Sequence, residues 1–198
     1  DGSQIVFVTK SEQGTDQFTS DIHTIQSDGS QNHTLLTFPG EIYRPSWSPD
    51  GSRILFLEII RKNYGIQGAN LYLTDTNGSP PQLLELPEQP STEYPPVSPY
   101  WPPAWSPNGE EILIKSNFTN TYIYSLKTGE FISLHFGEYP VWNLTGDGVA
   151  FQKVGHPNTI CQPTAELWDR SDSWNALMPC IDINTSIAGE TIPIGWRP

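Results

Sequence analysis

Few residues of this chain combine into a recognisable catalytic pattern. Paired carboxylates could perform acid–base chemistry, and Asp169/Asp172 and Glu110/Glu111 are of that type, although such pairs are more typical of solvated turns. The sequence contains no nucleophile elbow, zinc-protease helix, phosphate loop, dinucleotide fingerprint or calcium loop. The four histidines are dispersed: His23, His33, His135 and His156. We therefore expect a protein that is not an enzyme and that uses no cofactor or metal. A catalytic pair assembled from distant loops is the alternative.

The two cysteines, Cys161 and Cys180, favour a disulfide, with two separate buried thiols as the alternative. Neither has a further Cys or His at zinc-ligand spacing. A disulfide indicates a secreted or cell-surface protein, with the periplasm as second choice. Sequons point the same way and mark candidate N-glycosylation sites at Asn32, Asn117, Asn143 and Asn184, whereas Asn77 stands in a poor acceptor context.

Aromatic residues outside the repeated motif described below are the candidates for binding. Tyr94, Tyr100 and Trp101 lie in the proline-rich segment 87–103, and Trp168 and Trp174 lie further along. Aromatic rings on a proline-stiffened backbone lose little entropy on binding, so they could grip a protein partner or stack on sugar rings. The alternative is that they pack the loops onto the fold.

Composition excludes some partners. The 198 residues suit one domain, or at most two small ones. A net charge of -12 argues against nucleic acid, whose phosphates attract Lys and Arg. The longest apolar stretch, 54–60, is too short to span a membrane and contains Glu58. The chain begins with Asp1 and shows no signal peptide, so we interpret it as a mature or trimmed chain.

One unit recurs along the chain: a Trp, a tight Asp-Gly or Asn-Gly turn, then an apolar strand. It is SWSPDGSRILFLE from Ser46, AWSPNGEEILIKS from Ala104 and VWNLTGDGVAFQKV from Val141. A fourth copy is split, because GWRP at the end and DGSQIVFVT at the start join into the same unit. The Trp residues are 58, 37 and 54 positions apart, and 49 across the joined termini. This near-regular period of about 50 residues is typical of propeller blades.

Each unit predicts four antiparallel strands, a to d, with the Trp on strand a. The period-2 apolar pattern and the glycine turns are typical of all-β folds. The predicted b strands are 5–9, 54–57, 112–114 and 149–152; the c strands are 21–26, 71–74 and 122–126; the d strands are 33–37, 82–86 and 131–134.

The combination of WSPDG, an apolar strand and a DG or NG turn resembles the TolB-type β-propeller repeat, which is similar in fold to WD repeats. The resemblance implies a single four-bladed propeller over 1–198, with a ring closed by residues 192–197 as strand a of the first blade. It gives blades at 192–198 plus 1–38, 43–87, 101–136 and 139–190. It also implies inter-blade packing for Trp47, Trp105, Trp142 and Trp196, and turn positions for Asp50, Asn108, Asp147 and Asp1.

Two other assemblies fit the same sequence. The chain could be a slice of a longer tandem array, or its terminal strand could insert into a neighbouring copy.

The long insertions, 10–20, 59–69, 87–103 and 154–164, are predicted to be loops on one face of the propeller, which is usually the binding face. The function we favour is a non-catalytic extracellular protein-interaction or structural assembly module, including a self-associating subunit. A carbohydrate-binding propeller, or an accessory propeller of a larger enzyme such as a peptidase, is the alternative.

Overall fold

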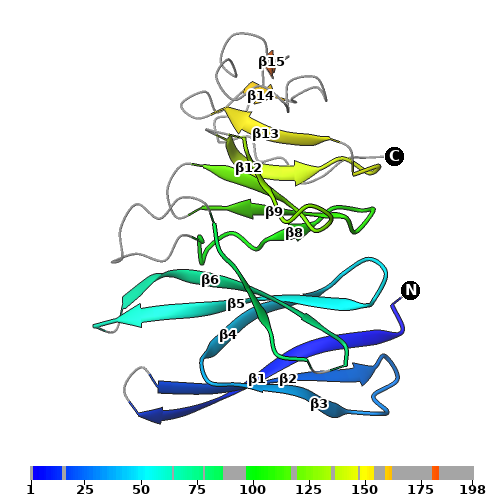
Figure 1. The fold of residues 1–198 in the computed structure, drawn as a ribbon, viewed down its shortest axis with the longest axis vertical. Coiled ribbons are helices and arrows are strands. Elements are labelled where there is room, and N and C mark those ends of the chain that lie inside the picture. Colours follow the sequence, from blue (N-terminus) through cyan, green and yellow to red (C-terminus); the bar gives the residue numbers. More distant parts are fainter. Residues whose placement is uncertain are drawn as a thin grey trace. The chain divides into compact units, whose positions relative to one another are not determined.

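The computed structural model describes residues 2–14, 17–63, 65–77, 79–86, 97–116, 120–134, 137–146, 148–153, 159–161 and 180–182. These residues form antiparallel sheets, which confirms the all-β class (Figure 1). The chain divides into two compact units, Asp1–Tyr100 and Trp101–Pro198, and each is described by itself. Among the described residues there is no helix long and apolar enough to cross a membrane.

The first unit contains two sheets that pack face to face. One has the order β1-β2-β3, with β1 at Gln4–Gly14, β2 at Gln17–Gln26 and β3 at His33–Phe38. The other has the order β4-β5-β6-β7, with strands at Glu41–Trp47, Arg53–Lys62, Gly65–Asp75 and Gln82–Leu84. Alternate residues of these strands bury an apolar core between the sheets. The core contains Ile22, Phe38, Ile42, Ile54 and Phe56.

The second unit repeats this arrangement. Strands β8 (Ala104–Trp105), β9 (Glu111–Lys115), β10 (Thr121–Ser125) and β11 (Phe131–Ser133) form one sheet in sequence order. Strands β12 (Gly137–Trp142), β13 (Val149–Lys153), β14 (Thr159–Cys161) and β15 (Cys180–Asp182) form the other. Their shared core contains Leu113, Ile123, Leu134, Trp142, Val149 and Phe151.

Each predicted b, c and d strand coincides with an observed strand. The ends agree to within two residues, except that β1, β2, β5 and β6 extend further at the hairpin tips. The sheets that begin at β4, β8 and β12 each have four strands in the predicted order a-b-c-d. The predicted strand a of the first sheet, 192–197, lies outside the described residues.

The interpretation of 10–20 and 59–69 as loops was wrong. Strand β1 runs on to Gly14 and pairs with β2 up to Gln17, while β5 pairs with β6 up to Lys62 and Gly65. The polar side chains near these tips suggested loops, but antiparallel strands can expose polar side chains to water while their backbones stay paired. The two segments are therefore extended hairpins. The predicted loop 154–164 was wrong as well, because Thr159–Cys161 form strand β14.

The repeated Trp-to-Gly motif folds the same way in each described copy. Ser48 Oγ donates to Asp50 Oδ1 at 2.6 Å and accepts from the Arg53 amide at 2.9 Å. Ser106 Oγ makes the same pair of bonds to Asn108 and the Glu111 amide, at 2.6 and 2.9 Å. Glycine follows because the backbone enters the left-handed region there, with φ of 71° at Gly51 and 74° at Gly109.

The copy that starts at Val141 aligns differently from the sequence-based prediction. Its left-handed glycine is Gly146, with φ of 80°, four residues after Trp142, as Gly51 is after Trp47. The side-chain oxygen of Asn143 accepts from the amides of Gly146 and Gly148, so Asn143 takes the place of Ser48. Asp147 and Asp1 lie outside the described residues.

Candidate functional site

A buried carboxylate, Glu41, organises one end of the first unit. Its side chain is only 4% exposed, and it lies at the start of β4. Lys10 of β1 donates to Oε1 at 3.2 Å, and Arg61 of β5 donates from Nε to Oε2 at 2.6 Å. The hydroxyl of Tyr43 donates to Oε1 at 3.1 Å. We call these four residues the Glu41 cluster.

The hydrogen bonds of the cluster favour the charged forms of Glu41 and Lys10. Burial alone would raise the pKa of Glu41, but the hydrogen bonds from Arg61, Lys10 and Tyr43 outweigh it, so the pKa falls below its usual value. Burial would lower the pKa of Lys10, and its interactions with Tyr43 and Glu41 outweigh that effect and raise it. With two cations and one carboxylate, the cluster is locally positive on an acidic chain.

Aromatic rings complete the cluster. The ammonium of Lys10 lies 3.7 Å from the centre of the Tyr43 ring, and the guanidinium of Arg61 lies 5.8 Å from that of Phe18. Cation–π contacts of this kind are worth about 0.5–1 kcal/mol at exposed sites. Because the partners come from β1, β2, β4 and β5, the cluster fixes the two extended hairpins to β4.

A β-bulge in β4 lies beside the cluster. The register shifts between Tyr43 and Ser46, and Arg44, which precedes Pro45, has a φ of 54°. A left-handed backbone is unfavourable for a residue with a side chain, by about 1–2 kcal/mol. Tyr43 is 36% exposed and Arg44 is exposed as well. The bulge thus exposes Tyr43 and Arg44 to solvent. Bulges often change the direction of side chains next to functional sites.

Sequence reasoning missed this bulge, although a signal was present. Strand β12 has the same shift, with Tyr139 at a φ of 51° before Pro140. In both strands a proline stands two residues before the motif Trp, and Pro103 repeats this spacing before Trp105. A proline inside a strand indicates an edge or a bulge.

The aromatic residues predicted to bind differ in their surroundings. Tyr100 is 68% exposed. Trp101 is half-buried and packs edge-to-face on Tyr139, with ring centres 4.7 Å apart. Tyr94, Trp168 and Trp174 lie outside the described residues.

Two of the motif tryptophans, Trp142 and Trp47, pack against the apolar core of their own unit. Trp142 is buried in the core of the second unit, and its indole Nε1 donates to the carbonyl of Ala104 at 3.1 Å. Trp47 packs against the core of the first unit. Its indole Nε1 is buried and has no hydrogen-bond partner among the described residues. Trp105 is half-buried, and Trp196 lies outside the described part of the chain.

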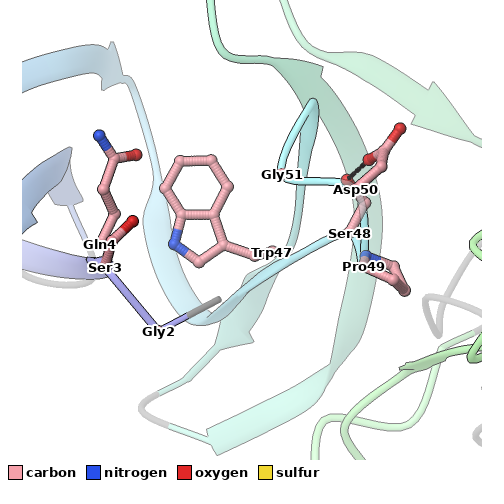
Figure 2. A pocket seen from close by; sticks show the side chains of 8 residues that line it. All are labelled: Gly2, Ser3, Gln4, Trp47, Ser48, Pro49, Asp50 and Gly51. Carbon is pink, nitrogen blue, oxygen red and sulfur yellow. Dashed lines mark hydrogen bonds between the residues drawn. The ribbon is translucent and has the colours of Figure 1, made fainter.

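A pocket of about 520 Å³ lies beside Trp47. It is lined by two stretches of the repeat, Gly2–Gln4 at the start of the chain and Trp47–Gly51. Figure 2 shows the indole of Trp47 between these stretches, with its nitrogen turned toward Ser3 and Gln4.

The two cysteines occupy paired positions on neighbouring strands. Cys161 of β14 is the direct antiparallel partner of Cys180 of β15. Of the candidate glycosylation sites, Asn32 is exposed and Asn143 is half-buried in its turn, while Asn117 and Asn184 lie outside the described residues.

Of the residues considered for acid–base chemistry, His23 has structural contacts, whereas His135, His156, Asp169 and Asp172 lie outside the described residues. His23 stacks on Phe7, with ring centres 4.9 Å apart, and its two ring nitrogens contact the hydroxyls of Thr9 and Thr34. Burial, and then the neighbouring Glu110, raise the pKa of Glu111. Within the described part of the chain, no group of three or more His, Cys, Asp or Glu could hold a metal ion.

Comparison with solved structures finds propeller-like folds. An oligogalacturonate lyase in complex with manganese aligns with a TM-score of 0.60 at 12% identity, over 83% of this chain and 48% of that one. The oligogalacturonate lyase of Vibrio parahaemolyticus gives 0.60 at 11%, over 83% and 49%. The C-terminal WD40 domain of Sif2 gives 0.53 at 14%, over 84% and 43%.

These likenesses establish a propeller-like fold and nothing finer. The chain spans about half the length of each of these structures. No protein-family model matches the sequence. No curated protein matches it either.

Proposed function

We propose that this chain is a non-catalytic extracellular protein-interaction module, and that it contacts its partner through Tyr43 and Arg44 of the β4 bulge. The observation that carries the proposal is an exposed Arg44 at a strained backbone position, next to an exposed Tyr43 whose hydroxyl contacts the buried Glu41. Strained backbone of this kind persists only where the surroundings enforce it.

The Glu41 cluster supports such a role because it stiffens the surface before binding. Lys10 and Arg61 tie the two hairpins to β4, so little conformational entropy remains to be lost when a partner binds. Tyr and Arg are also the side chains most enriched at energetically dominant positions of interfaces. Arg44 adds an exposed cation next to Tyr43, which favours a protein partner with an acidic segment.

The scaffold that we propose is a four-bladed ring, with residues 192–197 completing the first sheet. Three observed four-stranded sheets and the three-stranded sheet β1-β2-β3 support this count. The extracellular location rests on Cys161 and Cys180, whose register on neighbouring strands suits a disulfide.

Site-specific photocrosslinking tests the contact surface. A photoactivatable phenylalanine analogue replaces Tyr43 in one sample and Leu83, which is 38% exposed on β7, in the control. We expect a protein from the source organism to be captured from position 43 and not from position 83. Arg44→Glu should abolish its capture, and so should raising the salt to about 0.5 M. Equal capture from both positions, or none, contradicts the proposal.

Carbohydrate binding is a second candidate, favoured by the exposed ring of Tyr100 and the partly exposed ring of Trp101. Two of the structural neighbours are oligogalacturonate lyases, so an acidic oligosaccharide is the first ligand to test. Titration calorimetry with oligogalacturonate should give heat that Trp101→Ala removes. No heat with the unaltered chain would exclude this ligand.

A further inference from the structure

The β5–β6 hairpin has an irregular register beside the Glu41 cluster. Ile60 pairs with Gly68, whereas the next residue of β5, Arg61, pairs with Ile66. Strand β6 therefore has one residue more than β5 at this point, and Gln67 lies between the two pairs. An extra residue of this kind is a β-bulge, and bulges are frequent next to functional sites. The bulge determines which side chain stands opposite Arg61.

The bulge places an apolar side chain next to the cluster. In a regular ladder Gln67 would stand opposite Arg61, but the bulge puts Ile66 there instead. Directly opposed residues of an antiparallel pair share a face, with Cβ atoms about 4.5–5.5 Å apart. Ile66 is 38% exposed, and the guanidinium of Arg61 lies 5.8 Å from the centre of the Phe18 ring. We call Phe18, Arg61 and Ile66 the hairpin patch.

The hairpin that carries Ile66 has a tight turn. Lys62 pairs with Gly65, so only two residues connect β5 to β6. Asn63, the first of these two, has a φ of 54°, which is the left-handed backbone that two-residue hairpin turns favour. Figure 1 shows β1 and β5 ending on the same side of the first unit. A short turn leaves little conformational freedom to be lost when a partner binds.

We infer that the hairpin patch extends the contact surface at Tyr43 and Arg44, and that the two together bind one extended acidic peptide segment that also carries a large apolar side chain. The exposed cation of Arg44 attracts a carboxylate of the segment. Ile66, together with the hydrocarbon part of Arg61, offers apolar surface to the second side chain. The inference rests on the proposed function, because it names the kind of segment that the protein partner presents.

The geometry of the sheet sets the distance between the two groups on the peptide. Tyr43 pairs with Leu57, Arg61 lies four residues further along β5, and Ile66 is across the ladder from Arg61. With about 3.3 Å per residue and about 4.8 Å between strands, Tyr43 and Ile66 are roughly 16 Å apart. An extended peptide covers this distance in about five residues. The segment should therefore carry its carboxylate and its apolar side chain at that spacing.

Selection from a phage-displayed library of random peptides tests the inference with a defined probe. The whole chain is immobilised, and the peptides that it retains are sequenced. We expect the retained peptides to combine Asp or Glu with a large apolar residue about five positions away. The Arg44→Glu chain should not retain these peptides, because it repels their carboxylate.

Ile66→Thr isolates the apolar contact, because threonine keeps the β-branched shape that suits a strand and adds no charge. Leu83→Thr is the matched control, since Leu83 is also 38% exposed and lies on β7 of the same sheet. By fluorescence anisotropy, a retained peptide should bind the Ile66→Thr chain about fivefold more weakly than the unaltered chain. The Leu83→Thr chain should bind it as well as the unaltered chain does. Ile66→Val, which keeps most of the apolar surface, should restore most of the affinity.

Three results overturn the inference and leave the contact at Tyr43 and Arg44 to be judged by crosslinking. They are retention of no peptide, retention of acidic peptides without the apolar residue, and equal affinity of the Ile66→Thr and unaltered chains. Peptides that the Arg44→Glu chain retains equally well contradict the proposed function itself. The two failures are therefore distinguishable.

Discussion

Replacement of Glu41 by Gln tests the idea that the buried ion cluster holds the two hairpins in place. The carboxylate is 4% exposed and contacts Lys10 and Arg61, whose side chains are 32% and 22% exposed. Breaking a fully buried ion pair costs about 3–5 kcal/mol. Here both cations reach water, which reduces that cost, so we expect a loss of about 2 kcal/mol.

Urea unfolding of the whole chain measures this loss. Glu12→Gln is the matched control, because Glu12 is an exposed carboxylate on the same hairpin, and its change should stay within about 0.5 kcal/mol. A Glu41→Gln variant as stable as the Glu12→Gln control would refute the assignment of the cluster as the element that fixes the hairpins.

The dependence on pH gives the same test a second readout. Because the folded-state pKa of Glu41 lies below its usual value of 4.5, its contribution is fully present above that value and is lost as the pH falls through the lowered pKa. The stability difference between the unaltered chain and Glu41→Gln should therefore shrink below about pH 4. A difference that stays constant down to pH 2 would contradict the charge-based explanation.

Three further predictions follow from the turns and the cysteines. Ser48→Ala should raise the pKa of Asp50 from about 2 toward 3.8, because the hydrogen bond from the Ser48 hydroxyl is the largest cause of the low value. NMR titration of the carboxyl group measures this pKa, and an unchanged value would contradict the prediction. Gly51→Ala should destabilise the chain by about 1 kcal/mol, because the backbone there is left-handed, with a φ of 71°. The added carbon itself meets no atom within 4 Å, so the loss comes from the backbone alone. An unfolding curve identical to that of the unaltered chain would exclude this strain. The two cysteines, opposite each other on β14 and β15, should form a disulfide. The oxidised chain should then be lighter than the reduced chain by two hydrogen atoms, and equal masses would show free thiols.

The strand plan could be predicted from the sequence because its signals are local. The apolar run Ile54–Leu57, and the left-handed glycines at Gly51 and Gly109, depend on residues close in the chain. The turn after Trp142 was misaligned because Asp147-Gly148 looks like the motif turn. Asn143, through its hydrogen bonds to the chain, instead selects Gly146.

The candidate site could not be predicted because its contacts join distant strands. Lys10, Glu41 and Arg61 are far apart in the sequence. Only the packing of β1 on β4 and the pairing of β4 with β5 bring them together. The hairpin tips were read as loops because their polar residues hide the ladder. The bulge at Arg44 had a repeated signal in Pro45 and Pro140, but the strain at Arg44 becomes visible only in the backbone dihedral angle.

The central claim is that the β4 bulge, with Tyr43 and Arg44 exposed, is the surface that contacts a protein partner. Photocrosslinking from position 43, with position 83 as the control, tests it most directly. We predict capture of a protein from position 43 that Arg44→Glu abolishes, and no capture of that protein from position 83. Equal capture from both positions, or capture that Arg44→Glu leaves unchanged, would contradict the account.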